Sequence, residues 1–412
     1  MPFLVSPLAR ALPNSVLGAV NNERSPLDGR DLTDSLLDEV WRENARLPGK
    51  WADEGMVENA RISHLLAKPA MFGRPLVLVR AIHRDASLET IECTFADAGS
   101  HFGYRPAAPD KRRPDAELAA KQQEFATLYE ETLDAVKSSL AEITGRSAPK
   151  EHTLGRTRAL RAKVLEWQHQ GRAIRLLADG SRLIRLTIHA SPQVARDWLD
   201  DSLVRAPARE RAARLARGVS READGTVLLP AVRPIPQGFQ PYCGLNTLAM
   251  SARHFGLHID EDWLAVAGGF RNTGSAAGSD IIGLYPAVAA EAGFGMKRVT
   301  RLDFHTVKGA IDQGFPVVVW RRFSHERDQL HSRFVRELAR DPSATLPSPA
   351  DPAEVATWPG KDAPLHASVI VGYHEKRGEL LFLESWTGKD RPRRMTAREM
   401  AATISYAFVF GP

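Results

Sequence analysis

The feature that most constrains the fold of this 412-residue chain is a change of pattern near residue 226. Prolines at positions 230, 234 and 236 mark this boundary. Beyond it the helix-like segments are 243–255, 260–268 and 281–293, and the strand-like segments are 295–302, 315–323, 366–374, 379–386 and 405–410. Helices followed by short strands rich in Val, Ile, Phe and Tyr are typical of an α+β domain with an antiparallel sheet.

The chain ahead of this change divides into two predicted parts. Residues 1–30 mix Pro, Gly, Asn and Arg without periodicity, which predicts a loosely ordered arm. Residues 31–225 predict a second α+β region, with a helix at 31–44 and a hairpin turn at Asp179-Gly180. Because this region holds no cluster of Cys, His or paired acids with catalytic spacing, we expect it to have a structural, regulatory or substrate-presenting role.

The remaining residues, 226–412, form the predicted C-terminal domain. A polar insertion at 324–364 interrupts its strands, and its first half looks helical while its second half looks irregular. The size of the chain agrees with two or three domains, each large enough to bury a core.

Composition excludes several classes of protein. The net charge of +5 is spread thinly among interleaved acids, so we expect no nucleic-acid partner. No apolar run approaches the roughly 20 residues that span a bilayer. Two cysteines cannot build a disulfide framework, and neither they nor the histidines have metal-site spacing, so no cofactor is expected. Localisation stays open between the cytoplasm and export with a signal peptide absent from this sequence, and the oligomeric state is unknown.

One of the two cysteines, Cys243, stands where a helix is expected to begin. It follows Pro241, which is disfavoured inside helices, and its thiol would face the unsatisfied amides of the first turn. That position lowers the pKa of a thiol and favours the nucleophilic thiolate. Gln237, six residues upstream, can add a side-chain amide to the Cys243 backbone amide as donors to an oxyanion, and Gln240 is the rival donor.

A general base for this thiol would come from elsewhere in the fold. His366 begins one strand-like segment, and Glu384 ends the next one, eighteen residues later. Two paired antiparallel strands would bring the imidazole and the carboxylate side by side, so Glu384 could orient the ring. Trp386 could then shield their hydrogen bond from water. The pattern indicates acyl transfer by a cysteine nucleophile.

The order of these motifs resembles that of the papain-like cysteine peptidases over residues about 235–412. Gln237, Cys243, "HASVIVGYH" and "ESWTG" stand where that family has Gln, Cys, "HAV..VGY" and "NSWG". The "CG" followed by small and apolar helix residues, together with "IDQGFPVVVW", is closer to the bacterial branch similar to the bacteriocin-processing leader peptidases.

The resemblance implies a papain-like domain in which Cys243 is the nucleophile and His366 the general base and acid. It also implies that Gln237 is an oxyanion donor and that Glu384 takes the place of the ring-orienting Asn or Asp. The expected activity is that of a thiol hydrolase, a cysteine peptidase acting on a peptide or protein substrate. A deamidase, transglutaminase or isopeptidase would use the same triad. A catalytically silent papain-fold binding protein is a further alternative, although a silent relative has no reason to keep Gln, Cys and His together.

Overall fold

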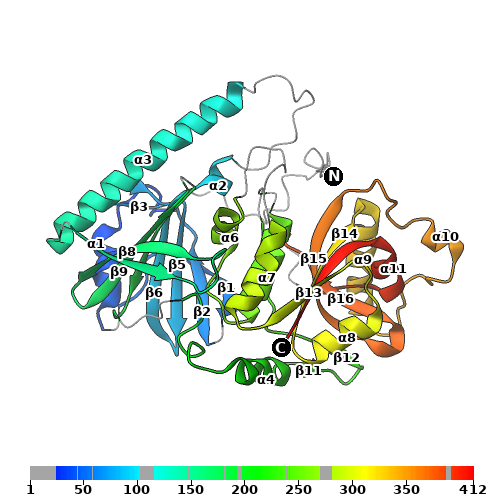
Figure 1. Cartoon of the computed structure of the whole chain (residues 1–412). Coiled ribbons are helices and arrows are strands. Elements are labelled where there is room, and N and C mark those ends of the chain that lie inside the picture. Colours follow the sequence, from blue (N-terminus) through cyan, green and yellow to red (C-terminus); the bar gives the residue numbers. More distant parts are fainter. Residues whose placement is uncertain are drawn as a thin grey trace.

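The chain folds into helices and two large antiparallel sheets, so the predicted α+β class is confirmed. The computed structural model describes residues 25–43, 45–57, 59–102, 116–146, 148–180, 182–192, 197–237, 240, 242–269, 281–386 and 391–412. Most of the predicted arm, and also Pro241, lies outside these residues. In Figure 1 the first sheet lies on the left and the second on the right, with helices packed between them.

The first sheet has eight strands in the order β1-β2-β5-β6-β10-β9-β8-β7. Its strands are β1 (Trp51–Val57), β2 (Ala60–Leu65), β5 (Leu78–Arg84), β6 (Ser87–Asp97), β7 (Lys150–Leu154), β8 (Ala162–His169), β9 (Arg172–Asp179) and β10 (Leu183–His189). The short strands β3 (Ala70–Met71) and β4 (Arg74–Pro75) pair separately. The predicted hairpin is present, since β9 and β10 pair across the turn at Asp179-Gly180.

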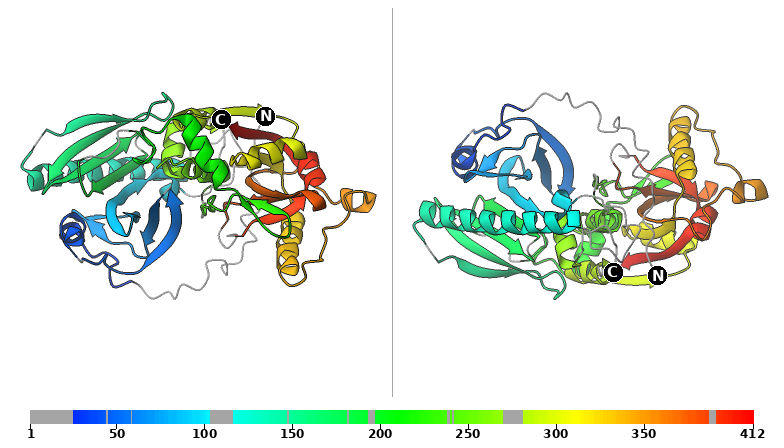
Figure 2. Two further views of the ribbon diagram at one scale, coloured as in Figure 1. Left: turned by 90° about the horizontal axis from the view of Figure 1, so that it is seen from below. Right: turned by 90° about the horizontal axis from the view of Figure 1, so that it is seen from above.

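Four helical segments accompany this sheet: α1 (Thr33–Leu37), the 3-10 helix η2 (Glu39–Trp41), α2 (Ala98–Phe102) and α3 (Ala116–Thr144). The long helix α3 packs across β6 and β8 and extends along the sheet (Figure 2). The single helix predicted at 31–44 is wrong, because it is divided into α1 and η2. The indole of Trp41 donates to the carbonyl oxygen of Leu36 at 2.9 Å, in place of the backbone amide that would continue the helix.

The second sheet also has eight strands. Six follow the order β11-β12-β15-β14-β18-β13, and β16 and β17 extend the sheet from β15. Their bounds are β11 (Ser220–Arg221), β12 (Thr226–Leu228), β13 (Gly295–Val299), β14 (Val317–Arg322), β15 (Leu365–His374), β16 (Glu379–Leu383), β17 (Arg393–Thr396) and β18 (Ile404–Gly411). All five strands predicted from the sequence are present, whereas β11, β12 and β17 were not predicted.

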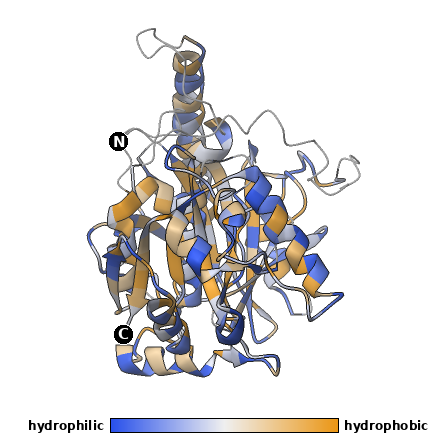
Figure 3. Ribbon diagram, turned by 90° about the vertical axis from the view of Figure 1, so that its right-hand side faces the viewer, coloured by the Kyte–Doolittle hydropathy of each residue, from blue (hydrophilic) through white to orange (hydrophobic). Residues whose placement is uncertain are grey.

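The helices of this half are α4 (Ala208–Arg217), α5 (Cys243–His254), α6 (Glu261–Ala267), α7 (Ile281–Glu291), α8 (Phe304–Asp312), α9 (His325–Leu338), α10 (Pro352–Val355) and α11 (Ala397–Thr403), with the 3-10 helix η3 (Glu375–Arg377). Apolar residues gather along the strands, and the outer helices carry mixed polar and apolar faces (Figure 3). Within the described residues, no helix is both long and apolar enough to cross a bilayer.

Helix α9 begins the predicted polar insertion and packs firmly against β17. Arg327 donates to both carboxylate oxygens of Glu399 in α11, at 2.9 and 2.7 Å, and His331 lies 3.1 Å from the same carboxylate. Phe334 is also buried. The first half of the insertion is therefore part of the packed domain, and the segment that follows carries only the short helix α10.

One apolar core joins the two sheets, and a second core, which includes residues of α1 and α3, belongs to the first half alone. Leu160, Leu177 and Trp198 of the first half belong to the same cluster of buried side chains as the residues of α5, α6 and α7. The rings of Trp198 and Trp263 are 5.6 Å apart. Such a contact list marks one continuous core, so the helices between the sheets are buried on both sides.

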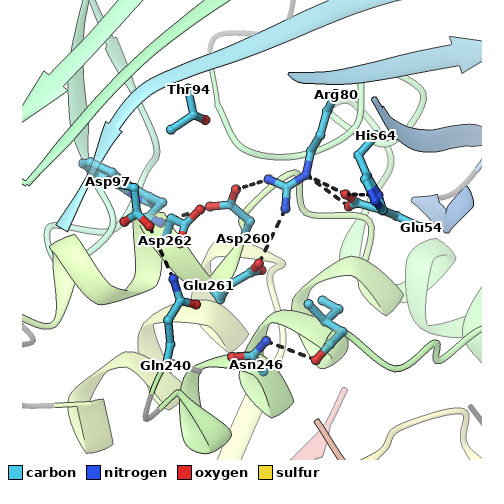
Figure 4. A network of polar contacts seen from close by, with 12 residues as sticks. Glu54, His64, Arg80, Thr94, Asp97, Gln240, Asn246, Asp260, Glu261 and Asp262 are labelled. Carbon is cyan, nitrogen blue, oxygen red and sulfur yellow. Dashed lines mark hydrogen bonds and ion pairs between the residues drawn. The ribbon is translucent and has the colours of Figure 1, made fainter. Parts of the chain in front are cut away.

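Buried ion pairs also connect the first sheet to helix α6 (Figure 4). Arg80 on β5 donates to Asp260, which caps α6, at 2.7 Å, and it also donates to Glu54 on β1 at 3.0 Å. Arg185 on β10 lies 2.7 Å from the same Asp260 carboxylate. Burial alone would raise the pKa of Asp260, but the charges of Arg185 and Arg80 lower it, so the carboxylate stays ionised.

Candidate functional site

Helix α5 presents Cys243 at its first turn. The preceding residue, Tyr242, occupies the N-cap position without a side-chain cap, so the first-turn amides have no acceptor from it. The helix from Gly244 to Ala252 is buried on all sides, while Cys243 itself is half-buried. Only glycine fits at position 244, because a Cβ there would lie 2.4 Å from the ring of Trp320 on β14. The thiol is thus held at the end of a fixed helix.

His366, the first predicted partner, lies at the start of β15 and is 7% exposed. Its imidazole lies close enough to the Cys243 thiol for each group to shift the pKa of the other, and the backbone amide of Ala367 also contributes to the lowered pKa of the thiol. Its Nε2 atom lies 2.5 Å from Oε2 of Glu384. Because Nε2 is occupied by the carboxylate, Nδ1 is the ring nitrogen left for the thiol. The structure therefore brings Cys243, His366 and Glu384 together in one chain of contacts.

Aromatic rings cover the imidazole. The ring of Trp386 stacks on His366 with centroids 4.3 Å apart and planes inclined by 23°, as the sequence predicted for its shielding role. Phe323 lies 5.7 Å from His366 and packs edge-on against Trp386. These rings exclude water from the bond between imidazole and carboxylate, where a low dielectric strengthens it.

Glu384 has three further partners that the sequence analysis missed. Its Oε1 atom accepts from Arg321 at 2.7 Å and from the Ser368 hydroxyl at 2.9 Å, and it lies 2.8 Å from the guanidinium of Arg393. The carboxylate is fully buried. Burial alone would favour the protonated carboxyl, and the charges of His366 and Arg321 lower its pKa and keep it an anion.

Two of these residues left a signal in the sequence. Arg321 directly faces His366 across the β14 and β15 pair, and it follows the apolar run at 317–320 of β14. Ser368 shares a face with His366, because side chains two positions apart in a strand point the same way. Arg393 comes from β17, a strand that was not predicted, so nothing local marked it.

The pKa values of the three groups all shift in the direction that favours the charged form of each group. Burial would raise the pKa of Cys243, but the hydrogen bond and charge of His366 bring it below its usual value. Burial would lower the pKa of His366, but the Glu384 carboxylate raises it to about 9. Burial would likewise raise the pKa of Glu384, and the charges of His366 and Arg321 lower it. These directions favour a thiolate, an imidazolium and a carboxylate at neutral pH.

We expect the rate of Cys243 alkylation by iodoacetamide to stay high below the usual thiol pKa of 9. The thiolate exists above the lowered pKa of Cys243, and the imidazolium persists up to about pH 9, so the ion pair occupies the pH range between these two values. Measuring the rate from acid to alkaline pH by intact mass and peptide mapping tests this. Cys93 is an internal control, because it is fully buried and its pKa is raised. A half-maximal rate at pH 9 or above would contradict the ion pair.

Gln237, the predicted oxyanion donor, is tied to the segment that carries the carboxylate. Its backbone amide donates to the Ser385 carbonyl at 2.7 Å, and its Oε1 accepts from the Ser385 hydroxyl at 2.5 Å. Its Nε2 donates to the carbonyl of Gln240 at 2.8 Å, which uses one of its two hydrogens. The side chain of the rival Gln240 instead reaches Asp97 and Ser100 of the first half. Among the described residues nothing else accepts from the side-chain amide of Gln237, so its second hydrogen is left for a ligand.

A metal site was not expected, and none of the described residues form a group of three or more His, Cys, Asp or Glu side chains that could hold an ion. The candidate residues supply a thiol of lowered pKa, a proton carrier next to a carboxylate, and the side-chain amide of Gln237 bonded to Ser385. Groups of these kinds can attack a carbonyl carbon and stabilise the oxyanion that forms.

Part of the chain is similar to a peptidase family. No curated protein matches the chain. A solved structure described as a C39-like peptidase from Bacillus anthracis is 17% identical with a TM-score of 0.30, over 45% of this chain and 98% of that one. A family model described as the Peptidase_C39 like family matches residues 230–407, less than half of the chain, and this range includes all four candidate residues. The match supports a cysteine peptidase of the papain-like type.

Proposed function

We propose that this protein is a thiol hydrolase, and specifically a cysteine peptidase that cleaves a peptide or protein substrate through an acyl-enzyme on Cys243. The observation that carries the proposal is the buried chain of contacts from the Cys243 thiol through His366 to Glu384. The similarity of residues 230–407 to a peptidase family supports the choice of peptide bonds as substrate.

In the proposed reaction the Cys243 thiolate attacks the carbonyl carbon of the scissile bond, and the C=O electron pair moves to oxygen. The backbone amide of Cys243 and the free Nε2 hydrogen of Gln237 donate to that oxyanion. The tetrahedral intermediate then expels the amine, which takes a proton from the His366 imidazolium. Water next attacks the thioester and gives a proton to His366, and the C–S bond breaks to release the carboxylic acid and restore the thiolate.

Glu384 does not need to accept a proton in this scheme. Its role is to hold the imidazole with Nδ1 toward the sulfur and to stabilise the imidazolium. The contacts from Arg321, Ser368 and Arg393 support this role, because they fix the longer Glu side chain that stands where relatives have Asn or Asp. Each is a positioning residue rather than a group that touches the substrate.

Within this class we propose the branch similar to the bacteriocin-processing leader peptidases. The support is the Cys243-Gly244 pair and the small residues that follow in α5, which allow Trp320 to pack against the helix start. The substrates of that branch are not transferred to this chain, because no residue described above selects a particular sequence.

The alternatives use the same atoms but differ in the acceptor of the acyl group. The test is to incubate the protein with a peptide library in heavy-oxygen water, with Cys243→Ala as the blank. A peptidase creates new C-termini that contain one heavy oxygen, and we expect this product. A deamidase would label glutamine or asparagine side chains without a new terminus, and a transglutaminase would join peptides with loss of ammonia. If neither sample gave a product and Cys243 were alkylated slowly, the silent binding protein would be the remaining alternative. That result would overturn the proposal.

A further inference from the structure

A turn of the first half touches the residues that immediately precede the candidate nucleophile. Gly99 lies in α2, directly after β6, and a Cβ at this position would lie 2.4 Å from the hydroxyl oxygen of Tyr242 and 2.9 Å from Nε2 of Gln240. The backbone of Gly99 is not left-handed, so glycine is needed there for space and not for conformation. Tyr242 is 1% exposed. The two segments are therefore packed as tightly as their backbones allow.

The same turn offers Gln240 a fixed acceptor. Asp97, 6% exposed, accepts from the amides of Gly99 at 3.0 Å and Ser100 at 2.7 Å. Its Oδ2 atom also accepts from Nε2 of Gln240 at 3.4 Å (Figure 4). The Ser100 hydroxyl is a second acceptor for the same Nε2, at 3.4 Å. Because two backbone amides orient the Asp97 carboxylate, it cannot follow a displaced Gln240 without breaking them.

Gln240 is also hydrogen-bonded to the candidate site. Its carbonyl oxygen accepts from Nε2 of Gln237 at 2.8 Å, and its own amide donates to the Gln237 carbonyl at 3.1 Å. Gln237 is in turn bonded to Ser385, the neighbour of Glu384. The contacts thus run without a gap from Asp97 and Gly99 in the first half to the proposed oxyanion donor.

Buried ion pairs hold the first half of the chain against the helices of the second half. Asp260, at the start of α6, lies 2.7 Å from both Arg80 and Arg185 of the first sheet, and Arg253 of α5 lies 3.4 Å from Glu54. Breaking such a buried pair is costly, because it leaves an uncompensated charge. Since α5 itself takes part, the first sheet cannot shift without moving the helix that carries Cys243.

We propose that the first half is a permanent positioning part of the enzyme: through Gly99 and Asp97 it fixes Gln240, and thereby the oxyanion-donor geometry at Gln237. The inference rests on the proposed function and adds a regulation of the same site, since any change in the docking of the first half alters turnover. It also predicts that the first half is retained in the active protein and is not removed as a propeptide.

The test compares Gly99→Ala with Gly309→Ala, a glycine in α8 whose Cβ would meet nothing within 4 Å. In Gly99→Ala the new methyl group must displace Tyr242 or Gln240. We expect kcat on a cleaved library peptide to fall about 10- to 100-fold with KM nearly unchanged, because displacing a catalytic donor by about 1 Å has costs of this size. The alkylation rate of Cys243 should change far less, since iodoacetamide forms no oxyanion. Gly309→Ala should match the wild type in both measurements.

Gln240→Ala is the second variant, and it removes the tie to Asp97 without adding bulk. We expect it to lower kcat in the same direction, with the Cys243 alkylation rate retained. Folded Gly99→Ala and Gln240→Ala proteins that both keep wild-type kcat would overturn the inference while leaving the peptidase intact. Equal losses of kcat and of alkylation rate would also overturn it, because they would indicate a general loosening of α5. A wild type without turnover and without selective Cys243 alkylation would instead remove the proposed function itself.

Discussion

The His366→Ala variant is expected to lose nearly all peptidase turnover, with kcat falling on the order of 10⁵- to 10⁶-fold, as when a member of a catalytic triad is deleted. Two effects combine. The thiol loses the partner that lowers its pKa, so little thiolate remains at neutral pH. The leaving amine also loses its proton donor. The measurement is single-turnover cleavage of a peptide found in the library, together with the alkylation rate of Cys243 at pH 7.

His331→Ala is a matched control for this variant. His331 is also a buried histidine bonded to a glutamate, at 3.1 Å from Glu399, but it belongs to α9 and not to the strand that carries His366. We expect His331→Ala to lower thermal stability and to keep both alkylation and turnover. If His366→Ala kept fast alkylation of Cys243 at neutral pH, the thiolate and imidazolium pair would be refuted as the source of reactivity.

Glu384→Gln is expected to have the second-largest effect on activity, with kcat falling by roughly 10⁴-fold, the loss known when the orienting acid of a triad becomes its amide. The imidazolium loses its counter-charge, and an amide that presents N–H to Nε2 favours the wrong tautomer of His366. The pKa of His366, raised to about 9 in the wild type, should fall toward its ordinary value. An NMR titration of the His366 ring and a pH profile of turnover would measure both changes.

The same substitution is expected to cost about 3–5 kcal/mol of folding free energy, the usual price of removing one partner from a buried ion pair. Arg321 and Arg393 would remain side by side without the carboxylate. Because the pKa of Glu384 is lowered, its stabilising effect is present above the unfolded pKa and is lost as the pH falls through the folded value. The difference in melting temperature from the wild type should therefore be greatest near neutral pH and shrink in acid.

Glu399→Gln separates these two effects. Glu399 is a buried carboxylate with an arginine and a histidine as partners, and it has no contact with His366. We expect a comparable loss of stability but a normal alkylation rate and a normal His366 pKa. An equal loss of activity in both variants would contradict a specific orienting role for Glu384.

The core of the candidate site could be predicted because it depends on local patterns. A cysteine at a helix start and two strands separated by a short turn are readable from the sequence, and pairing of β15 with β16 follows from their proximity in the chain. The roles assigned to Cys243, His366, Glu384 and Gln237 remain predictions until activity is measured. Placing His366 beside Glu384 needed no knowledge of distant contacts, whereas pairing Cys243 with His366 depended on the resemblance to a known family.

The support around Glu384 could not be predicted in the same way. Arg321 and Arg393 come from β14 and β17, which reach the carboxylate only through the strand order of the sheet. The contacts between the two halves join residues that are still farther apart in the sequence, since Arg80 and Asp260 are separated by 180 positions. Charged residues on a short helix or strand are normally read as solvent-exposed, and only the folded arrangement reveals that these acids and bases neutralise one another in the interior.

The burial of Cys93 has a practical consequence for anyone who works with this protein. Of the chain's two thiols, one is enclosed in β6 and the other is half-exposed at the start of α5. A thiol reagent added in excess is therefore expected to react once per native chain and twice per unfolded chain. The moles of reagent consumed per mole of chain would then report how much of a preparation is correctly folded, before any substrate is known.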